Sequence, residues 1–203
     1  MQTSDRTRYA LVVRLPREVE VRIEDTYLGL AGITKPTMGF HITLLGGFYL
    51  PEGAGIESLC SIADVCARHQ PFQVRIYGLG AFEAKENNVV YLHVTDANHI
   101  MALHDDLLEA TSACIVHQNE QYREWNVDAY YPHVTLGLGL SDQELLAFLR
   151  DSANRVLDET CEISEVWLAA QHPDGSWRYI ASYTLGVPAS AELPSRSCAD
   201  AGQ

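Results

Sequence analysis

The sequence lacks the features that mark a metal-binding, disulfide-linked or membrane protein. Its five cysteines include no CxxC pair, so we expect reduced, mostly buried thiols rather than a zinc site or a redox disulfide. No apolar run approaches the roughly 18 residues that a membrane span needs. The N-terminal apolar run from Tyr9 to Val13 ends at Arg14, so we expect no signal peptide and a cytoplasmic protein.

Basic side chains are also scarce. The chain has 14 lysines and arginines against 27 acidic residues, which gives a net charge of −13. Binding to a phosphate backbone depends on Lys and Arg, so this balance argues against long duplex DNA or RNA as a partner. A local pocket for a small phosphate compound is still compatible with an acidic surface. We expect a monomer with no membrane partner.

The length and composition predict one globular domain. The 203 residues, 47% hydrophobic and 20% charged, are enough to bury a core. We expect a single two-lobed domain over residues 1–187. Residues 188–203 have low hydrophobicity and are predicted to form a disordered tail.

Hydrophobic periodicity predicts an α+β fold. Helices are expected over residues 16–29, 56–69, 98–116 and 141–153. Strands are expected over residues 9–14, 72–82, 89–95, 161–171 and 176–186, in addition to two strands described below. Pro16 fits a helix start, Asp96 or Asn98 could cap the third helix, and Ser141 with Glu144 forms a capping box. The order predicts two pseudo-symmetric lobes with mainly antiparallel sheets, flanking helices and an active-site cleft between them.

Two nearly identical segments stand out, HITLLGG beginning at His41 and HVTLGLG beginning at His133. In a strand, alternate side chains share a face, so His41 and Thr43 point together, as do His133 and Thr135. Glycines near both strands leave room for a ligand or another strand to approach: Gly46, Gly47, Gly137 and Gly139. If the two strands face each other, they form a pocket with two imidazoles and two hydroxyls.

Such a pocket suits phosphodiester chemistry. One neutral histidine can accept a proton from an attacking water or hydroxyl, and the other, protonated, can donate one to the leaving oxygen. Threonine hydroxyls can donate hydrogen bonds to the non-bridging phosphate oxygens. This mechanism requires no metal and no cofactor. Which histidine is acid and which is base depends on how the substrate lies.

The two motifs resemble those of the two-histidine (2H) phosphoesterase superfamily, which includes 2′-5′ RNA ligase-like proteins and cyclic phosphodiesterases. The resemblance covers residues 8–187. It implies acid and base roles for His41 and His133, and phosphate contacts for Thr43 and Thr135. It also implies a substrate with a cyclic phosphate or 2′-5′ linkage, either a small nucleotide or an RNA terminus. A nucleotide-phosphate binding or sensing protein with little turnover and a 2′-5′ RNA ligase are the alternatives.

Further candidates lie around the two motifs. An aromatic cluster precedes the second motif and could stack on a base: Tyr122, Trp125, Tyr130 and Tyr131. Phe48 could play the same part after the first motif. Three cations could neutralise a phosphate, namely Lys35, Arg123 and Arg178.

The remaining histidines are weaker candidates. His93 and Thr95 repeat the HxT spelling but lack the leucine and glycines that follow the other two motifs, so we interpret His93 as a half-buried strand residue. The others are scattered and predict no metal site: His69, His99, His104, His117 and His172.

Overall fold

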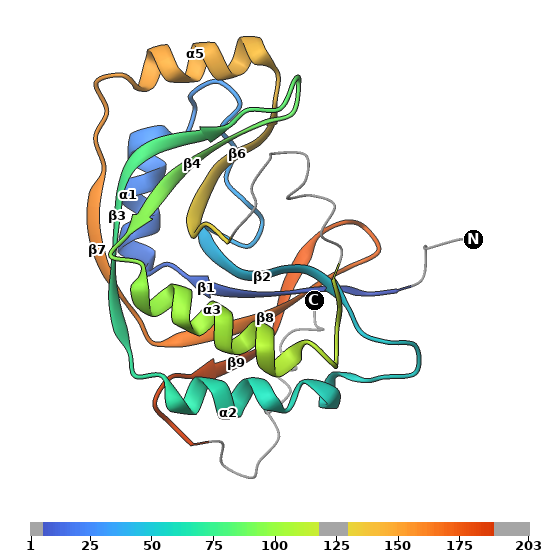
Figure 1. Ribbon diagram of the computed structural model, residues 1–203. Coiled ribbons are helices and arrows are strands. Elements are labelled where there is room, and N and C mark those ends of the chain that lie inside the picture. Colours follow the sequence, from blue (N-terminus) through green and yellow to red (C-terminus); the bar gives the residue numbers. More distant parts are fainter. Residues whose placement is uncertain (1–5, 118–129, 189–203) are drawn as a thin grey trace, which may run out of the picture.

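The computed structural model describes residues 6–117 and 130–188, and Figure 1 shows their arrangement. The strands form one nine-stranded sheet of antiparallel pairs, in the order β7-β3-β4-β6-β2-β1-β8-β9, with β5 paired to β2. The strands are β1 (Arg8–Arg14), β2 (His41–Tyr49), β3 (Phe72–Phe82), β4 (Asn88–Thr95), β5 (Val116–His117), β6 (His133–Leu140), β7 (Asp158–Ile163), β8 (Glu165–Gln171) and β9 (Trp177–Thr184). The described helices are α1 (Arg17–Tyr27), the 3-10 helix η1 (Ile56–Leu59), α2 (Ser61–Arg68), α3 (Asn98–Thr111) and α5 (Asp142–Ser152).

The sheet has two halves of four strands, β7-β3-β4-β6 and β2-β1-β8-β9, which meet where β2 pairs with β6 at Ile42 and Val134. The antiparallel α+β prediction is confirmed. The expectation of two separate sheets across a cleft is corrected, because one curled sheet runs through both halves. The two histidine strands are therefore neighbours in that sheet.

The predicted strand over 161–171 is wrong. It divides at Ser164 into β7 and β8, which occupy different halves of the sheet. A one-residue link can join such distant positions only if the sheet curls round on itself. The alternation changes phase there, because Ser164 and Glu165 are two successive polar residues between Ile163 and Val166, so a local signal of the break was present in the sequence.

The four predicted helical segments are confirmed in order for the described residues, with two corrections. The capping box of Ser141 and Glu144 is present at the start of α5. The start of α3 has Ala97 at the N-cap and no side-chain cap, so neither Asp96 nor Asn98 has the predicted role. The expected helix over 56–69 is divided into η1 and α2.

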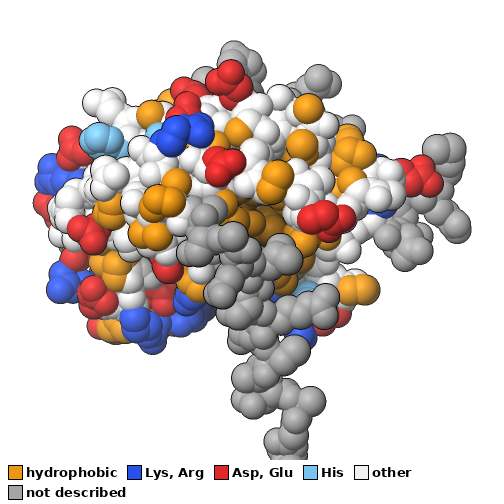
Figure 2. All heavy atoms as spheres, turned by 90° about the horizontal axis from the view of Figure 1, so that it is seen from below, with side chains coloured by type: hydrophobic (Ala, Val, Ile, Leu, Met, Phe, Trp, Pro, Cys, Tyr) orange, Lys and Arg blue, Asp and Glu red, His pale blue; other side chains and the backbone are white. Residues whose placement is uncertain are grey.

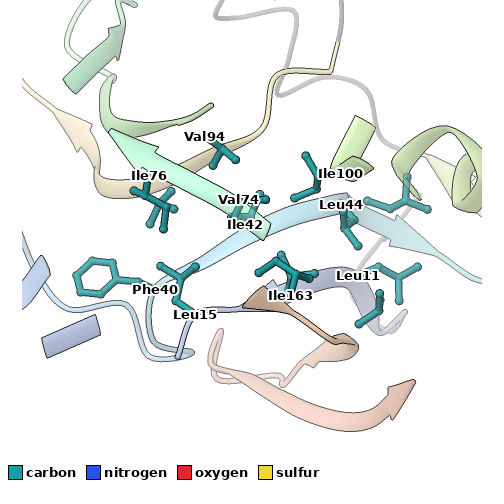
Figure 3. Close-up of a cluster of buried hydrophobic side chains, with 14 of the residues drawn as sticks. Leu11, Leu15, Phe40, Ile42, Leu44, Val74, Ile76, Val94, Ile100 and Ile163 are labelled. Carbon is teal, nitrogen blue, oxygen red and sulfur yellow. The ribbon is translucent and has the colours of Figure 1, made fainter. Parts of the chain in front are cut away.

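The hydrophobic core fixes which face of β2 and β6 is left for other uses. Ile42 and Leu44 point into a cluster that includes Val74, Val94 and Ile100 (Figure 3), and Val134 of β6 is fully buried with them. Each such side chain stabilises the fold by about 1.5–3 kcal/mol when buried. A one-residue slip would expose all of them, so the register is strongly specified.

Charged side chains of both signs lie on the surface. On the face in Figure 2, acidic, basic and hydrophobic side chains are interspersed, and neither sign of charge covers that face. No helix in residues 6–117 or 130–188 is long and apolar enough to cross a membrane.

The four described cysteines are free thiols, and two of them, Cys66 and Cys161, are buried. Burial raises the pKa of the Cys66 thiol to about 12 and that of Cys161 to about 11. Both therefore stay protonated and behave as small hydrophobic side chains.

Candidate active site

The pairing of β2 with β6 brings the two motifs together on one face of the sheet. The strands pair at the isoleucine and valine that directly follow the two histidines. In an antiparallel pair this register places His41 opposite Thr135, and it places Thr43 opposite His133. All four side chains are half-buried on the face opposite the core. We call this the site face.

Both imidazoles are oriented by the same kind of backbone contact. Nδ1 of His41 lies 2.9 Å from the carbonyl oxygen of Gly39. Nδ1 of His133 lies 2.7 Å from the carbonyl oxygen of Tyr131. A carbonyl only accepts, so in each ring Nδ1 carries the proton and donates it. Nε2 of each neutral ring is then the atom that can accept a proton from a substrate.

Burial sets the charge of the pair. Loss of solvent lowers the pKa of His41, and the carbonyl of Gly39 opposes this shift. Loss of solvent also lowers the pKa of His133, with the carbonyl of Tyr131 opposing and the nearby His41 and His93 adding to the shift. In the free protein, both rings are therefore neutral near pH 7.

A backbone turn supports His41. Gly39 has φ +74°, and a Cβ built there would lie 2.2 Å from Oε1 of Glu20. The carboxylate of Glu20 is buried and accepts a hydrogen bond of 3.1 Å from the backbone N–H of Phe40. Only glycine fits this position without displacing Glu20, so the carbonyl that holds His41 depends on it.

Side chains support His133. His93 of β4 pairs directly with His133 in the sheet. Its Nε2 lies 3.2 Å from the carbonyl of Leu79 and its Nδ1 lies 2.5 Å from the hydroxyl of Tyr131. The interpretation of His93 as a half-buried strand residue is confirmed. The β4–β6 register also places it beside the second motif, which sequence context did not indicate.

An aromatic cluster surrounds His133. Its ring centroid lies 5.2 Å from that of Phe82 and 5.1 Å from that of Tyr91. Tyr131 contacts both aromatic rings edge-on and remains exposed. Tyr131 is therefore next to the site. Tyr130 stacks on His104 with ring centroids 3.7 Å apart and donates its hydroxyl to the backbone carbonyl of Thr43 at 2.9 Å, so its ring is engaged within the protein.

The other sequence candidates do not gather here. Phe48 is fully buried and stacks on Tyr9, so the prediction that it contacts substrate is wrong. It lies six residues after Ile42, and alternation puts both on the core side. Lys35 forms an ion pair of 2.6 Å with Glu24. Three candidates lie outside the described residues: Tyr122, Arg123 and Trp125.

Gly137 of the second motif allows another part of the chain to pack closely against β6. A Cβ on Gly137 would lie 2.9 Å from the carbonyl oxygen of Gly32. The close approach expected at this position is therefore made by the protein's own loop.

A separate hollow includes His69 and His99 in its lining. His69 binds Asp106 at 2.8 Å and His99 stacks on Phe72, so both imidazoles are engaged. No group of three potential metal ligands was found within the described parts of the chain.

The structure adds residues that the sequence did not single out. Arg14 of β1 pairs with His41 in the sheet. Its guanidinium carbon lies 4.9 Å from the ring centroid of Trp167 and 4.8 Å from that of Tyr179. These contacts join strands from distant parts of the chain, so no local pattern could have indicated them.

Comparisons with known proteins place this site in a family. The family model described as the 2′-5′ RNA ligase superfamily matches residues 36–175, which include both motifs. The chain belongs to this superfamily. The resemblance to 2H phosphoesterases is thereby confirmed.

Curated relatives carry a matching name. A Bacillus pumilus protein named "Putative phosphoesterase" is 29% identical over 150 residues, covering 72% of this chain and 79% of the relative. A similarly named protein of Bacillus licheniformis is 25% identical over 147 residues, covering 72% of this chain and 80% of the relative.

Solved structures share the fold. The protein TT0787 of Thermus thermophilus matches with a TM-score of 0.61 at 19% identity, covering 88% of this chain and 98% of that one. E. coli LigT, complexed with 3′-AMP, matches with a TM-score of 0.59 at 17% identity, covering 89% of this chain and 99% of that one. At these identities the likeness concerns the fold alone.

Proposed function

We propose that the protein is a metal-independent phosphodiesterase that hydrolyses a cyclic phosphate or a 2′-5′ linkage in a small nucleotide or RNA terminus. The observation that carries this proposal is the matched orientation of His41 and His133. Both rings donate Nδ1–H to a backbone carbonyl two residues earlier and leave Nε2 for proton transfer.

The reaction uses the two rings in opposite protonation states. The anionic phosphate favours one added proton on the pair, because it offsets the burial that lowers both pKa values. The neutral ring accepts a proton through Nε2 as the water oxygen attacks phosphorus. The P–O bond to the leaving oxygen breaks, and that oxygen takes the proton from the other ring. Each transfer contributes about 10²- to 10⁴-fold in rate.

The two threonines supply hydrogen-bond donors beside the rings. In the antiparallel register, each threonine hydroxyl lies across from the histidine of the other motif. Thr43 and Thr135 would donate to the non-bridging oxygens, whose charge changes in the transition state. The exposed ring of Tyr131 is placed to stack on a nucleobase.

The size of the substrate follows from charge and from relatives. A net charge of −13 opposes tight capture of a long polyanion, which argues against ligation of large RNAs. The phosphoesterase names of the relatives and the LigT complex with 3′-AMP support a nucleotide phosphoester as the substrate.

The test is hydrolysis of 2′,3′-cyclic nucleotides and 2′-5′ oligoadenylates by the full chain in the presence of EDTA. We expect turnover that His41→Ala and His133→Ala each remove, while both variants keep the wild-type melting temperature within a few degrees. Turnover that survives both substitutions would rule out the mechanism. Saturable binding of nucleotides without turnover across the panel would instead identify a binding or sensing protein.

A further inference from the structure

The site face continues beyond His41 onto the other half of the sheet. Arg14 pairs with His41, and opposite residues of an antiparallel pair project to the same face about 5 Å apart. Trp167 pairs with Val12, two residues before Arg14 on β1, and so lies on this face as well. The guanidinium of Arg14 lies over the rings of Trp167 and Tyr179.

Arg14 carries its positive charge on the site face. Within the described residues, no carboxylate forms an ion pair with Arg14, although other cations do find acidic partners. Arg17, Arg22 and Arg75, for example, pair with Glu24, Glu159 and Asp158. Arg14 is also exposed. The rings order its side chain without neutralising its charge.

The rings themselves are fixed. Tyr179 donates its hydroxyl to the carbonyl of Met38 at 2.7 Å, directly before the Gly39 carbonyl that orients His41. Burial raises the pKa of Tyr179 to about 12, so the phenol stays protonated and keeps this bond. The position of the Arg14 guanidinium is thus tied to the same turn as the imidazole of His41.

We propose that Arg14, held by Trp167 and Tyr179, forms a subsite for a second phosphate group on the nucleotide substrate. The location of the first phosphate, between His41 and His133, rests on the proposed function. Strands are spaced about 4.8 Å apart, and Arg14 lies one strand beyond His41 with its guanidinium directed over β8 and β9, away from β6. It therefore meets a different group of the substrate.

The chemistry of the guanidinium selects an anion. The ring centroids of Trp167 and Tyr179 lie 4.9 and 4.8 Å from its central carbon, and the side chain is exposed. An edge with several N–H donors matches the oxygens of a phosphate group. We therefore expect the protein to prefer nucleotides that carry a terminal phosphate in addition to the phosphoester that reacts.

Equilibrium binding tests this subsite independently of turnover. We would measure binding of adenosine 3′,5′-bisphosphate and adenosine 3′-phosphate to the full chain by calorimetry. The wild type should bind the bisphosphate about 10- to 100-fold more tightly, as expected for one charged hydrogen-bonding partner. Arg14→Gln should remove this preference and leave the affinity for the monophosphate nearly unchanged.

Two controls separate the subsite from simpler effects. Arg150→Gln removes one positive charge from an exposed arginine on α5 and should keep the full preference. Arg14→Lys keeps the positive charge but lacks the planar guanidinium with its several N–H donors, so it should retain only part of the preference for the bisphosphate. Thermal unfolding would check that each variant is folded.

The outcomes are distinct. Equal affinity of the wild type for both nucleotides would overturn the subsite. So would an Arg14→Gln variant whose affinities for the bisphosphate and the monophosphate fall by the same factor. If the preference holds but no phosphodiester is hydrolysed, the proposed function fails and the subsite stands. If hydrolysis depends on both histidines but the preference is absent, the subsite fails alone.

Discussion

The two halves of the site reach one result by different means. In both, a half-buried histidine donates Nδ1–H to the carbonyl two residues earlier. Around His41 the support comes from the backbone, where Gly39 has a positive φ and lies against the buried Glu20. Around His133 further support comes from side chains, because the rings of Phe82 and Tyr91 lie against the imidazole and the neighbouring His93 is hydrogen-bonded to the hydroxyl of Tyr131.

This difference shows which part of each motif is under structural constraint. At the turn before His41 a Cβ would displace the carboxylate of Glu20 and strain the positive φ of Gly39, so a small substitution there should move the imidazole. The support of His133 is distributed over several rings, and loss of one should be tolerated better. The two half-sites are therefore alike in the orientation of their imidazoles. They should differ in how strongly activity responds to substitutions around each histidine.

The largest effect is expected when both halves lose their imidazoles. His41→Ala and His133→Ala should each lower kcat by about 10²- to 10⁴-fold. The double variant should lose less than the product of the two single losses, since the rings act on one phosphate. Steady-state hydrolysis of a cyclic nucleotide measures this, and strictly multiplicative losses would contradict a shared role.

The backbone support of His41 predicts the next effect. Gly39→Ala should cost about 1–3 kcal/mol of stability and lower kcat about 10- to 100-fold, because the new Cβ displaces Glu20 and the Gly39 carbonyl. Gly53→Ala is the matched control, since Gly53 has φ +79° with no atom within 4 Å of its Cβ position. It should cost about 1 kcal/mol and leave kcat unchanged. Similar kinetics in both variants would refute the role of this turn.

The pH dependence tests what the halves share. The reactive species has one proton on the pair, and it dominates between the two pKa values of the coupled rings. Burial lowers both pKa values below the ordinary 6.5. The kcat/KM of the wild type should therefore peak below about pH 6.5 and fall as the pH rises. A maximum above about pH 7 would show that burial does not control the pair.

The smallest effect is expected from the side-chain support of His133. His93→Gln removes a ring that contributes to the lowered pKa of His133, so the limb of the kcat/KM profile that is set by His133 should move to higher pH. The kcat at the optimum should change by no more than about 10-fold, because the Tyr131 carbonyl still holds His133. A loss as large as that of His133→Ala would make His93 a third essential group.

The two-residue alternation of side chains in a strand was sufficient to predict the central residues of the site. Alternation gave the shared face of His41 with Thr43, and of His133 with Thr135, because side-chain direction is a local property of a strand. The same rule would have placed Phe48 in the core. The β3 strand and the α5 capping box were also readable locally.

Properties that depend on strand neighbours could not be read in this way. The position of His93 depends on the β4–β6 register, and that of Arg14 depends on the β1–β2 register. Both registers are set by packing between segments far apart in the sequence. The break at Ser164 has a local signal, the two successive polar residues Ser164 and Glu165, but the separation of β7 and β8 into different halves depends on the curl of the whole sheet.

The central claim is that both imidazoles, each held through Nδ1 by a backbone carbonyl, direct Nε2 at one phosphate. Nitrogen NMR of the histidine rings tests it most directly, in the free protein near pH 7 and after addition of adenosine 3′-phosphate. We expect His41 and His133 both to carry the proton on Nδ1, and both Nε2 signals to shift on binding. A proton on Nε2 in either free ring, or a shift confined to one histidine, would contradict the account.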